Sequence, residues 1–143
     1  MPTSHNNSGQ EIAAQYDLSL SEKSNALLEC IEAQPGATAK PMTPPRATVP
    51  NVLMYKVMNK MFAIMSIRGA EGVIVKCDPD QAQFLRDQYE GIGRRSHLDP
   101  RFWISIGLDS DVPTEEVHRL VEHSYELVCS KLTRKQKFEL SNL

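Results

Sequence analysis

Apolar and polar residues alternate along two parts of this chain, and this alternation predicts strands. It runs through residues 53–77 and returns at 102–108, with the period of two that gives a strand one buried face. Turn-forming residues interrupt the first part at 59–60 and at 68–72. We therefore predict three strands in the first part, a short strand near 94–98, and a further strand at 102–108.

Apolar residues at helical spacing predict three helices. The first covers residues 21–33 after a capping box that begins at Ser19, and the second runs from Asp78 to about residue 88. The third begins at about residue 114 and has an apolar stripe along one side. This stripe consists of Val117, Leu120, Val121, Ser124, either Leu127 or Val128, and Leu132.

The remaining segments suggest the domain organisation. Residues 1–18 are polar and lack periodicity, so we expect a disordered leader, and 134–143 reads as a basic flexible tail. Four prolines within 40–51 predict an extended surface connector. The domain at 19–133 is then expected to be a two-layer α+β sandwich. Its antiparallel sheet has helices on one face, in the order α-β-β-β-α-β-β-α.

The first hairpin decides which side chains face outward. A two-residue turn at 59–60 would place one set on the helix-covered face: Leu53, Tyr55, Val57, Phe62 and Ile64. The opposite set would be Met54, Lys56, Met58, Met61, Ala63 and Met65. A shift of one residue would exchange the faces of a whole strand, so a three-residue turn remains an alternative.

Charge is uneven along the chain. The 143 residues carry a formal net charge of −2, which gives no overall attraction to nucleic acid or to an acidic membrane. Residues 46–106 nevertheless hold nine basic and six acidic side chains. The predicted sheet is therefore the basic part of an acidic molecule.

Several classes of function find no support in the residues. Cys30, Cys77 and Cys129 stand at apolar positions without ligand spacing, which is typical of buried thiols in a reducing cytoplasm. His118 and His123 project from different sides of one helix, so they do not favour a metal site. There is no apolar run of membrane length, signal peptide, nucleophile elbow or phosphate loop. We expect a cytoplasmic, non-enzymatic protein without metal, cofactor, small-molecule substrate or membrane partner.

Five groups of residues, in order, resemble the MmcQ/YjbR family. They are Gln34-Pro35-Gly36-Ala37; Tyr55-Lys56-Val57 with residues 59–63; Val75-Lys76 before Asp78-Pro79; Trp103-Ile104-Ser105-Ile106; and residues 112–117 with 124–128. The resemblance covers about residues 24–133. It implies a YjbR-like α+β fold, similar to secretion chaperones and to a double-wing fold, and a DNA-binding function. The chain departs from the family pattern at 98–102, where the family tends to have a stretch that ends in histidine.

Two kinds of partner remain open. The candidates for contact with DNA are Lys56, Lys60, Lys76, Arg94, Arg95, His97, Arg101 and Trp103, since cations neutralise phosphates and a ring offers a stacking surface. The candidates for contact with a second copy or another protein are Met54, Met58, Met61 and Met65. Simpler interpretations stand beside both: a solvated lysine-bearing face, and methionines and a tryptophan packed in the core.

Overall fold

A single antiparallel sheet forms the centre of the molecule. The computed structural model describes residues 8–93 and 98–143, and its sheet has the strand order β1-β2-β3-β4-β6-β5. The strands are β1 Thr38–Met42, β2 Val52–Val57, β3 Lys60–Ser66, β4 Gly72–Lys76, β5 Ile92–Gly93 and β6 Trp103–Gly107. Every neighbouring pair is antiparallel, as the sequence predicted.

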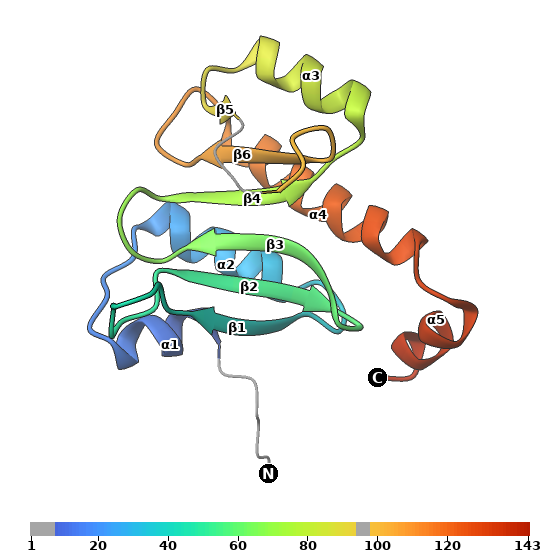
Figure 1. Cartoon of the computed structure of the whole chain (residues 1–143), viewed down its shortest axis with the longest axis horizontal. Helices are drawn as coiled ribbons and strands as arrows, with labels where there is room; N and C mark the ends of the chain where they lie inside the picture. The colour runs from blue at the N-terminus through green and yellow to red at the C-terminus, as the bar shows by residue number, and fades with distance from the viewer. Residues whose placement is uncertain (1–7, 94–97) are drawn as a thin grey trace.

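The helices leave one face of this sheet uncovered. They are α1 Gly9–Gln15, α2 Glu22–Glu32, α3 Pro79–Gln88, α4 Thr114–Ser130 and α5 Arg134–Ser141. In Figure 1, α2 and α4 lie behind the sheet, α3 lies beyond the β5 edge, and no helix crosses the near face. The predicted two-layer α+β sandwich and its order of elements are confirmed, with α1, β1 and α5 added. Within the described ranges, no helix has both the length and the apolar character needed to cross a bilayer.

Alternation in the strands and a stripe on α4 build the core. The strands contribute Leu53, Tyr55, Val57, Phe62, Ala63, Met65, Val73, Val75, Ile104 and Ile106, all buried. The α4 stripe contributes Val117, Leu120, Val121, Ser124, Tyr125 and Val128. Of the two alternatives for that stripe, Val128 is buried and Leu127 is half-buried.

The register of the first hairpin differs from the one we predicted. Its turn is Met58-Asn59, one residue earlier than expected, and both residues have positive φ, 47° and 67°, as a type I′ turn requires. A bulge between Tyr55 and Lys56 then shifts the pairing of β2 with β3. As a result Ala63 and Met65 belong to the buried face. Ile64, which we had assigned to that face, pairs with Met54 on the other one.

Beside the bulge, the Ser124 side chain forms hydrogen bonds with two backbone groups of β3 and β4. The pairing of β3 with β4 ends at Ala63 and Val75, so the next two residues, Phe62 and Lys76, are not paired with each other. The fully buried Ser124 hydroxyl accepts the Lys76 N–H at 2.8 Å and donates to the Phe62 carbonyl at 2.7 Å. It therefore satisfies two backbone groups and joins α4 to the sheet beside Lys76.

The chain has more structure before the first predicted helix than we expected. Within the predicted leader 1–18, α1 forms behind a capping box at Ser8, and Ile12 is buried. The Glu32 carboxylate on α2 accepts the Gly9 N–H at 2.7 Å and the Tyr55 hydroxyl at 2.5 Å, which fastens α1 to the domain. The cap of α2 is Ser21 and not Ser19.

Two further segments differ from their predictions. The first residues of the proline-rich connector belong to an edge strand, β1. Pro41 is tolerated there because the outer side of an edge strand pairs with no further strand, so the missing N–H leaves no partner unsatisfied. The predicted flexible tail contains α5, which starts with a capping box at Thr133. The strand predicted near 94–98 falls mostly outside the described residues, and the strand found in that region is β5.

Candidate nucleic-acid interface

The uncovered face of the sheet presents one continuous row of paired residues. From β1 to β6 the successive partners are Lys40, Met54, Ile64, Ile74 and Ser105. Their side chains are half-buried except that of Lys40, which is exposed. We call this uncovered side the open face. Its centre is apolar, and a lysine stands at one end of the row.

Two further pairs of residues bring the other two lysines of the open face. Lys56 pairs with Met61 on the β2–β3 side, and Lys76 pairs with Trp103 on the β4–β6 side. None of the six strands that the structure describes contains an aspartate or a glutamate. The open face therefore carries Lys40, Lys56 and Lys76 without a carboxylate from the strands between them.

Trp103 is held in place at the edge of this face. The Lys76 Nζ lies 5.9 Å from the centroid of its ring, a distance at which the cation and the ring attract each other. From α3, the Arg86 Nη2 donates to the Trp103 carbonyl at 3.3 Å and also to the Pro100 carbonyl. These contacts fix the strand on which the ring stands and leave the side chain half-buried.

Arg101, a predicted DNA contact, forms an ion pair with Asp99. Its guanidinium donates to the Asp99 carboxylate, with the Nη2 at 2.7 Å from Oδ2 and the Nε at 3.1 Å from Oδ1. Hydrogen bonds from the Arg101 side chain and backbone lower the pKa of Asp99 to about 2, so the pair is charged on both sides at neutral pH. The guanidinium also lies 5.2 Å from the centroid of the Phe102 ring. Asp99 thus offsets the charge of Arg101 just before Trp103.

The other predicted contacts fall into two groups. Lys60 pairs with Val57, whose side chain is on the covered face, so Lys60 is an exposed residue at the hairpin end and does not join the open face. Arg94, Arg95 and His97 lie outside the described residues. The structure thus brings three of the eight candidates, Lys56, Lys76 and Trp103, to one face.

The four methionines do not form one patch. Met54 and Met61 lie on the open face and are half-buried. Met58 is in the hairpin turn and packs against the core. Met65 pairs with Leu53 and is completely buried, because the bulge reverses the face we expected for it. The apolar part of the open face instead includes two residues that we had not predicted as interface residues, Ile64 and Ile74.

Lys40 is the basic residue that sequence reasoning missed. It lies in the segment that its prolines led us to assign to a connector. The available signal was the alternation across Thr38–Met42, where the half-buried Ala39 faces the core between exposed Thr38 and Lys40. A proline is compatible with this strand because β1 is at the edge of the sheet.

The thiols have the character of core residues. Burial raises the pKa of the Cys77 thiol to about 11, and the nearby Asp78 carboxylate adds to the effect. Burial also raises the pKa of Cys30 to about 11. Both thiols are therefore protonated at neutral pH, in which state a cysteine is a poor nucleophile.

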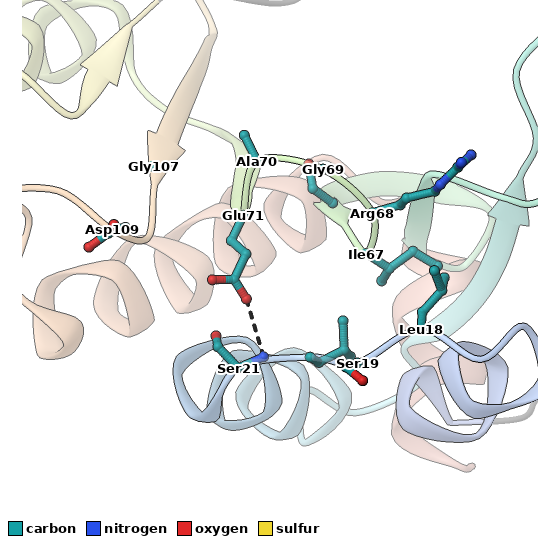
Figure 2. Close-up of a pocket in the computed structure, with 12 residues that line it drawn as sticks. Leu18, Ser19, Ser21, Ile67, Arg68, Gly69, Ala70, Glu71, Gly107 and Asp109 are labelled. Atoms are coloured by element: carbon teal, nitrogen blue, oxygen red, sulfur yellow. Dashed lines mark hydrogen bonds between the residues drawn. The ribbon is translucent and has the colours of Figure 1, made fainter.

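A cleft of about 750 Å³ lies at the other end of β4, away from Lys76. It is bounded by the α1–α2 loop and the β3–β4 turn, and Figure 2 shows the Glu71 carboxylate pointing to the backbone of Ser21. Glu71 accepts the Ser21 N–H at 3.2 Å and the Ser24 hydroxyl at 2.7 Å. Hydrogen bonds from Ser21 and Ser24 lower the pKa of Glu71. This acid therefore joins β4 to the start of α2, and the cleft does not extend the basic face.

Comparison with known proteins identifies relatives across most of the chain. The YjbR family model matches residues 32–127. The uncharacterized protein YjbR of Escherichia coli K12 is 27% identical over 112 residues, which cover 78% of this chain and 91% of that protein. YjbR of Escherichia coli O157:H7 has the same identity and coverage.

Solved structures agree with this assignment. The crystal structure of the Deinococcus radiodurans protein DR2400, a DUF419 domain, matches with a TM-score of 0.69 and 27% identity, over 82% of this chain and 86% of that one. A protein from Pseudomonas syringae shares the fold, with a TM-score of 0.58 and 18% identity over 76% of this chain and 98% of that one. The family model covers the strands from β1 to β6 together with most of α4. This chain is a member of the YjbR family.

Proposed function

We propose that this protein binds DNA through the open face of its sheet and acts by binding, not by catalysing a reaction. The main support for the proposal is the composition of that face, which carries three lysines and a tryptophan. The strands that form it contain no acidic residue in the part of the chain that the structure describes. Phosphates attract the ammonium groups, and bases stack on an aromatic ring. A cytoplasmic location, where DNA is available in bacteria and where free thiols persist, belongs to the same proposal.

Local charge supports this proposal more than total charge does. At a net charge of −2, the whole molecule provides no long-range attraction for a polyanion. Binding then depends on close contacts between phosphates and the lysines of the open face. Three such contacts predict that log K falls against log salt with a slope of about −2 for single strands and about −2.7 for duplex DNA.

The test is a titration of fluorescently labelled DNA, single-stranded and duplex, followed by anisotropy at several salt concentrations. Near ~50 mM salt the native chain binds both probes measurably, and raising the salt to ~200 mM weakens binding. Replacement of Lys40, Lys56 and Lys76 together by alanine removes this binding. A native chain that binds neither probe near ~50 mM salt contradicts the proposal.

A matched control separates position from charge. Replacement of Arg134, Lys135 and Lys137 by alanine removes three positive charges from α5, away from the open face. This variant is expected to bind DNA within about twofold of the native chain, since surface charges beyond a Debye length of about 10 Å are largely screened at 0.1 M salt. If both triple variants lose binding equally, the attraction is not specific to the open face.

A second candidate function rests on the apolar centre of the same face. Met54, Ile64 and Ile74 stand side by side on β2, β3 and β4, half-buried and without a helix over them. Exposed apolar patches with a polar rim are typical of protein interfaces. The alternative is therefore a module that pairs with a second copy of itself through the open face.

Light scattering during size-exclusion chromatography tests this alternative. A homodimer is expected at micromolar concentration, and Ile64→Lys is expected to convert it to a monomer by placing a charge at the centre of the contact. Lys135→Glu, a charge change on α5, serves as the control and leaves the dimer intact. A native chain that is monomeric at every concentration tested rules out pairing by this face.

A further inference from the structure

A small pocket opens beside Trp103, where β4 ends and β6 begins. Its volume is about 270 Å³, and α4 contributes Leu127 to its lining. Phe102, Trp103, Leu127 and Pro79 supply apolar walls. Binding sites for drug-sized ligands usually range from about 300 to about 1,000 Å³, so this pocket is suited to a single planar ring system.

Charged groups stand at the edge of this pocket. Lys76 from β4 and Lys131 from the C-cap of α4 both line it, and Lys131 is exposed. Asp78 also lines the pocket, but its carboxylate lies 3.5 Å from the His123 Nε2 on α4. The pocket thus combines aromatic walls with the ammonium groups of Lys76 and Lys131 and with the Asp78 carboxylate, which lies next to His123. A ring that carries a phosphate matches this combination.

The pocket and the open face share two residues. Lys76 and Trp103 belong to both, since they pair with each other on β4 and β6 and also line the pocket. A DNA strand that crosses the open face toward β6 therefore reaches the pocket with its phosphates near Lys76. The Lys76 N–H donates to the Ser124 hydroxyl on α4, which fixes the backbone of Lys76 at the edge of the pocket.

We propose that the pocket receives one unpaired nucleobase of the bound strand, stacked against Trp103 and Phe102, with its phosphate held by Lys76 and Lys131. The inference rests on the proposed function and names the form of DNA preferred: single-stranded or locally unpaired. A base within a duplex must first leave its stack and its partner, which costs a few kcal/mol. Single-stranded DNA enters without that cost.

The test compares a labelled oligothymidylate of 12 nucleotides with a 12-base-pair hairpin duplex, by anisotropy at ~50 mM salt. The native chain is expected to bind the single strand about tenfold more tightly, the order expected for one stacked base. Leu127→Trp fills the pocket and removes this preference, while duplex affinity stays within about twofold. Equal affinity of the native chain for both probes overturns the inference.

A second pair of variants leaves the core untouched. Lys131→Ala removes one ammonium from the pocket edge, whereas Lys135→Ala removes a comparable exposed lysine from α5. Lys131→Ala is expected to weaken single-strand binding about threefold more than Lys135→Ala does. An equal loss of single-strand affinity in the two variants contradicts the proposal that the pocket binds a base and its phosphate.

The native chain also carries its own reporter. Trp103 is the only tryptophan in the sequence, so intrinsic fluorescence reports on the pocket wall directly. Oligothymidylate is expected to quench this fluorescence in the native chain and in Lys135→Ala, and to quench it less in Lys131→Ala at the same DNA concentration. If DNA binds the open face but leaves Trp103 fluorescence unchanged, the proposed function stands and the pocket inference fails. If no DNA binds, the proposed function itself fails.

Discussion

Ser124 connects the covered side of the fold to its open side. Its hydroxyl occupies the gap that the bulge creates between Phe62 and Lys76, and it is completely buried. A serine in an apolar helix stripe would ordinarily suggest a tolerated small residue. Here it satisfies two backbone groups that no strand partner reaches, and one of them belongs to a lysine of the open face.

Replacement of Ser124 by alanine tests this role. The Lys76 N–H and the Phe62 carbonyl would remain buried without a partner, so the free energy of unfolding is expected to fall by about 1–3 kcal/mol. Urea denaturation measures the change. Ser130→Ala, an exposed position on the same helix, should change stability by less than about 0.5 kcal/mol. Equal stability of both variants would show that the hydroxyl is dispensable.

Glu71 gives the fold a dependence on pH. Hydrogen bonds from Ser21 and Ser24 hold its pKa below the ordinary glutamate value of about 4.3. A carboxyl with a lowered folded-state pKa contributes stability above its unfolded pKa, and this contribution is lost as the pH falls through the folded pKa. Glu71→Gln should therefore destabilise the protein near pH 7 and converge on the native chain as the pH falls through the lowered pKa of Glu71.

Thermal melting of both proteins between pH 7 and pH 3 measures this convergence. Glu126→Gln, an exposed acid on α4, provides the control and is expected to follow the native chain throughout. A constant difference between Glu71→Gln and the native chain across this range would mean that the charge of Glu71 does not stabilise the fold.

At the scale of elements, α1 is the addition whose attachment can be tested most simply. Gly9 opens this helix against α2 and β2, and a Cβ there would lie 2.7 Å from the Leu28 Cδ2 and 2.9 Å from the Tyr55 hydroxyl oxygen. Gly9→Ala should therefore loosen α1, at a cost of about 1–3 kcal/mol for overpacking. Hydrogen exchange should show faster exchange for amides 9–15.

Gly93→Ala is the matched control for this change, because a Cβ at that position meets nothing within 4 Å. Exchange in α1 should remain slow in this variant. If Gly9→Ala leaves exchange in α1 unchanged, the helix is not held by the close approach at its first residue.

The elements that sequence reasoning identified and those it missed differ in physical origin. Helix α4 and strand β6 were predictable because burial imposes a strong period on their residues. The register of the first hairpin was not, because it depends on a bulge and on positive φ at Met58, a residue type that rarely signals such a turn. Helix α1 has too few residues for its period to be visible, and its docking depends on tertiary contacts with Glu32 and Tyr55.

The same distinction applies to the candidate site. Lys56, Lys76 and Trp103 were found from alternation alone, since each stands at an outward position of a strand. Lys40 was missed because prolines obscured the edge strand. The ion pair of Arg101 with Asp99 was not predicted, because the two residues lie in a loop, where no period indicates which side chains meet.

At the scale of the whole molecule, a chain with a net charge of −2 presents Lys40, Lys56 and Lys76 on one sheet face, on strands that contain no acidic residue in the described part of the chain. This arrangement makes carboxylates near that face unfavourable for binding a polyanion, and Asp99 is the acid just before Trp103. Asp99→Asn keeps an oxygen that can accept the Arg101 N–H but removes the opposing charge. DNA affinity at ~50 mM salt is expected to rise about threefold, with a steeper salt dependence.

Asp109→Asn is the control for charge alone, because Asp109 lies in the cleft beyond the opposite end of β6. It should leave DNA affinity within about 1.5-fold of the native chain, as expected for a distant screened charge. An equal gain in both variants would attribute the effect to net charge and not to the open face.

Nuclear magnetic resonance of the 15N-labelled chain, titrated with oligothymidylate, tests the central claim most directly. The account predicts shifts at the backbone amides of Lys40, Lys56 and Lys76 and at the indole N–H of Trp103, which gives one unambiguous signal. The amides of α2 and α5 should remain in place. Shifts confined to those helices, with the strands unaffected, would contradict binding through the open face.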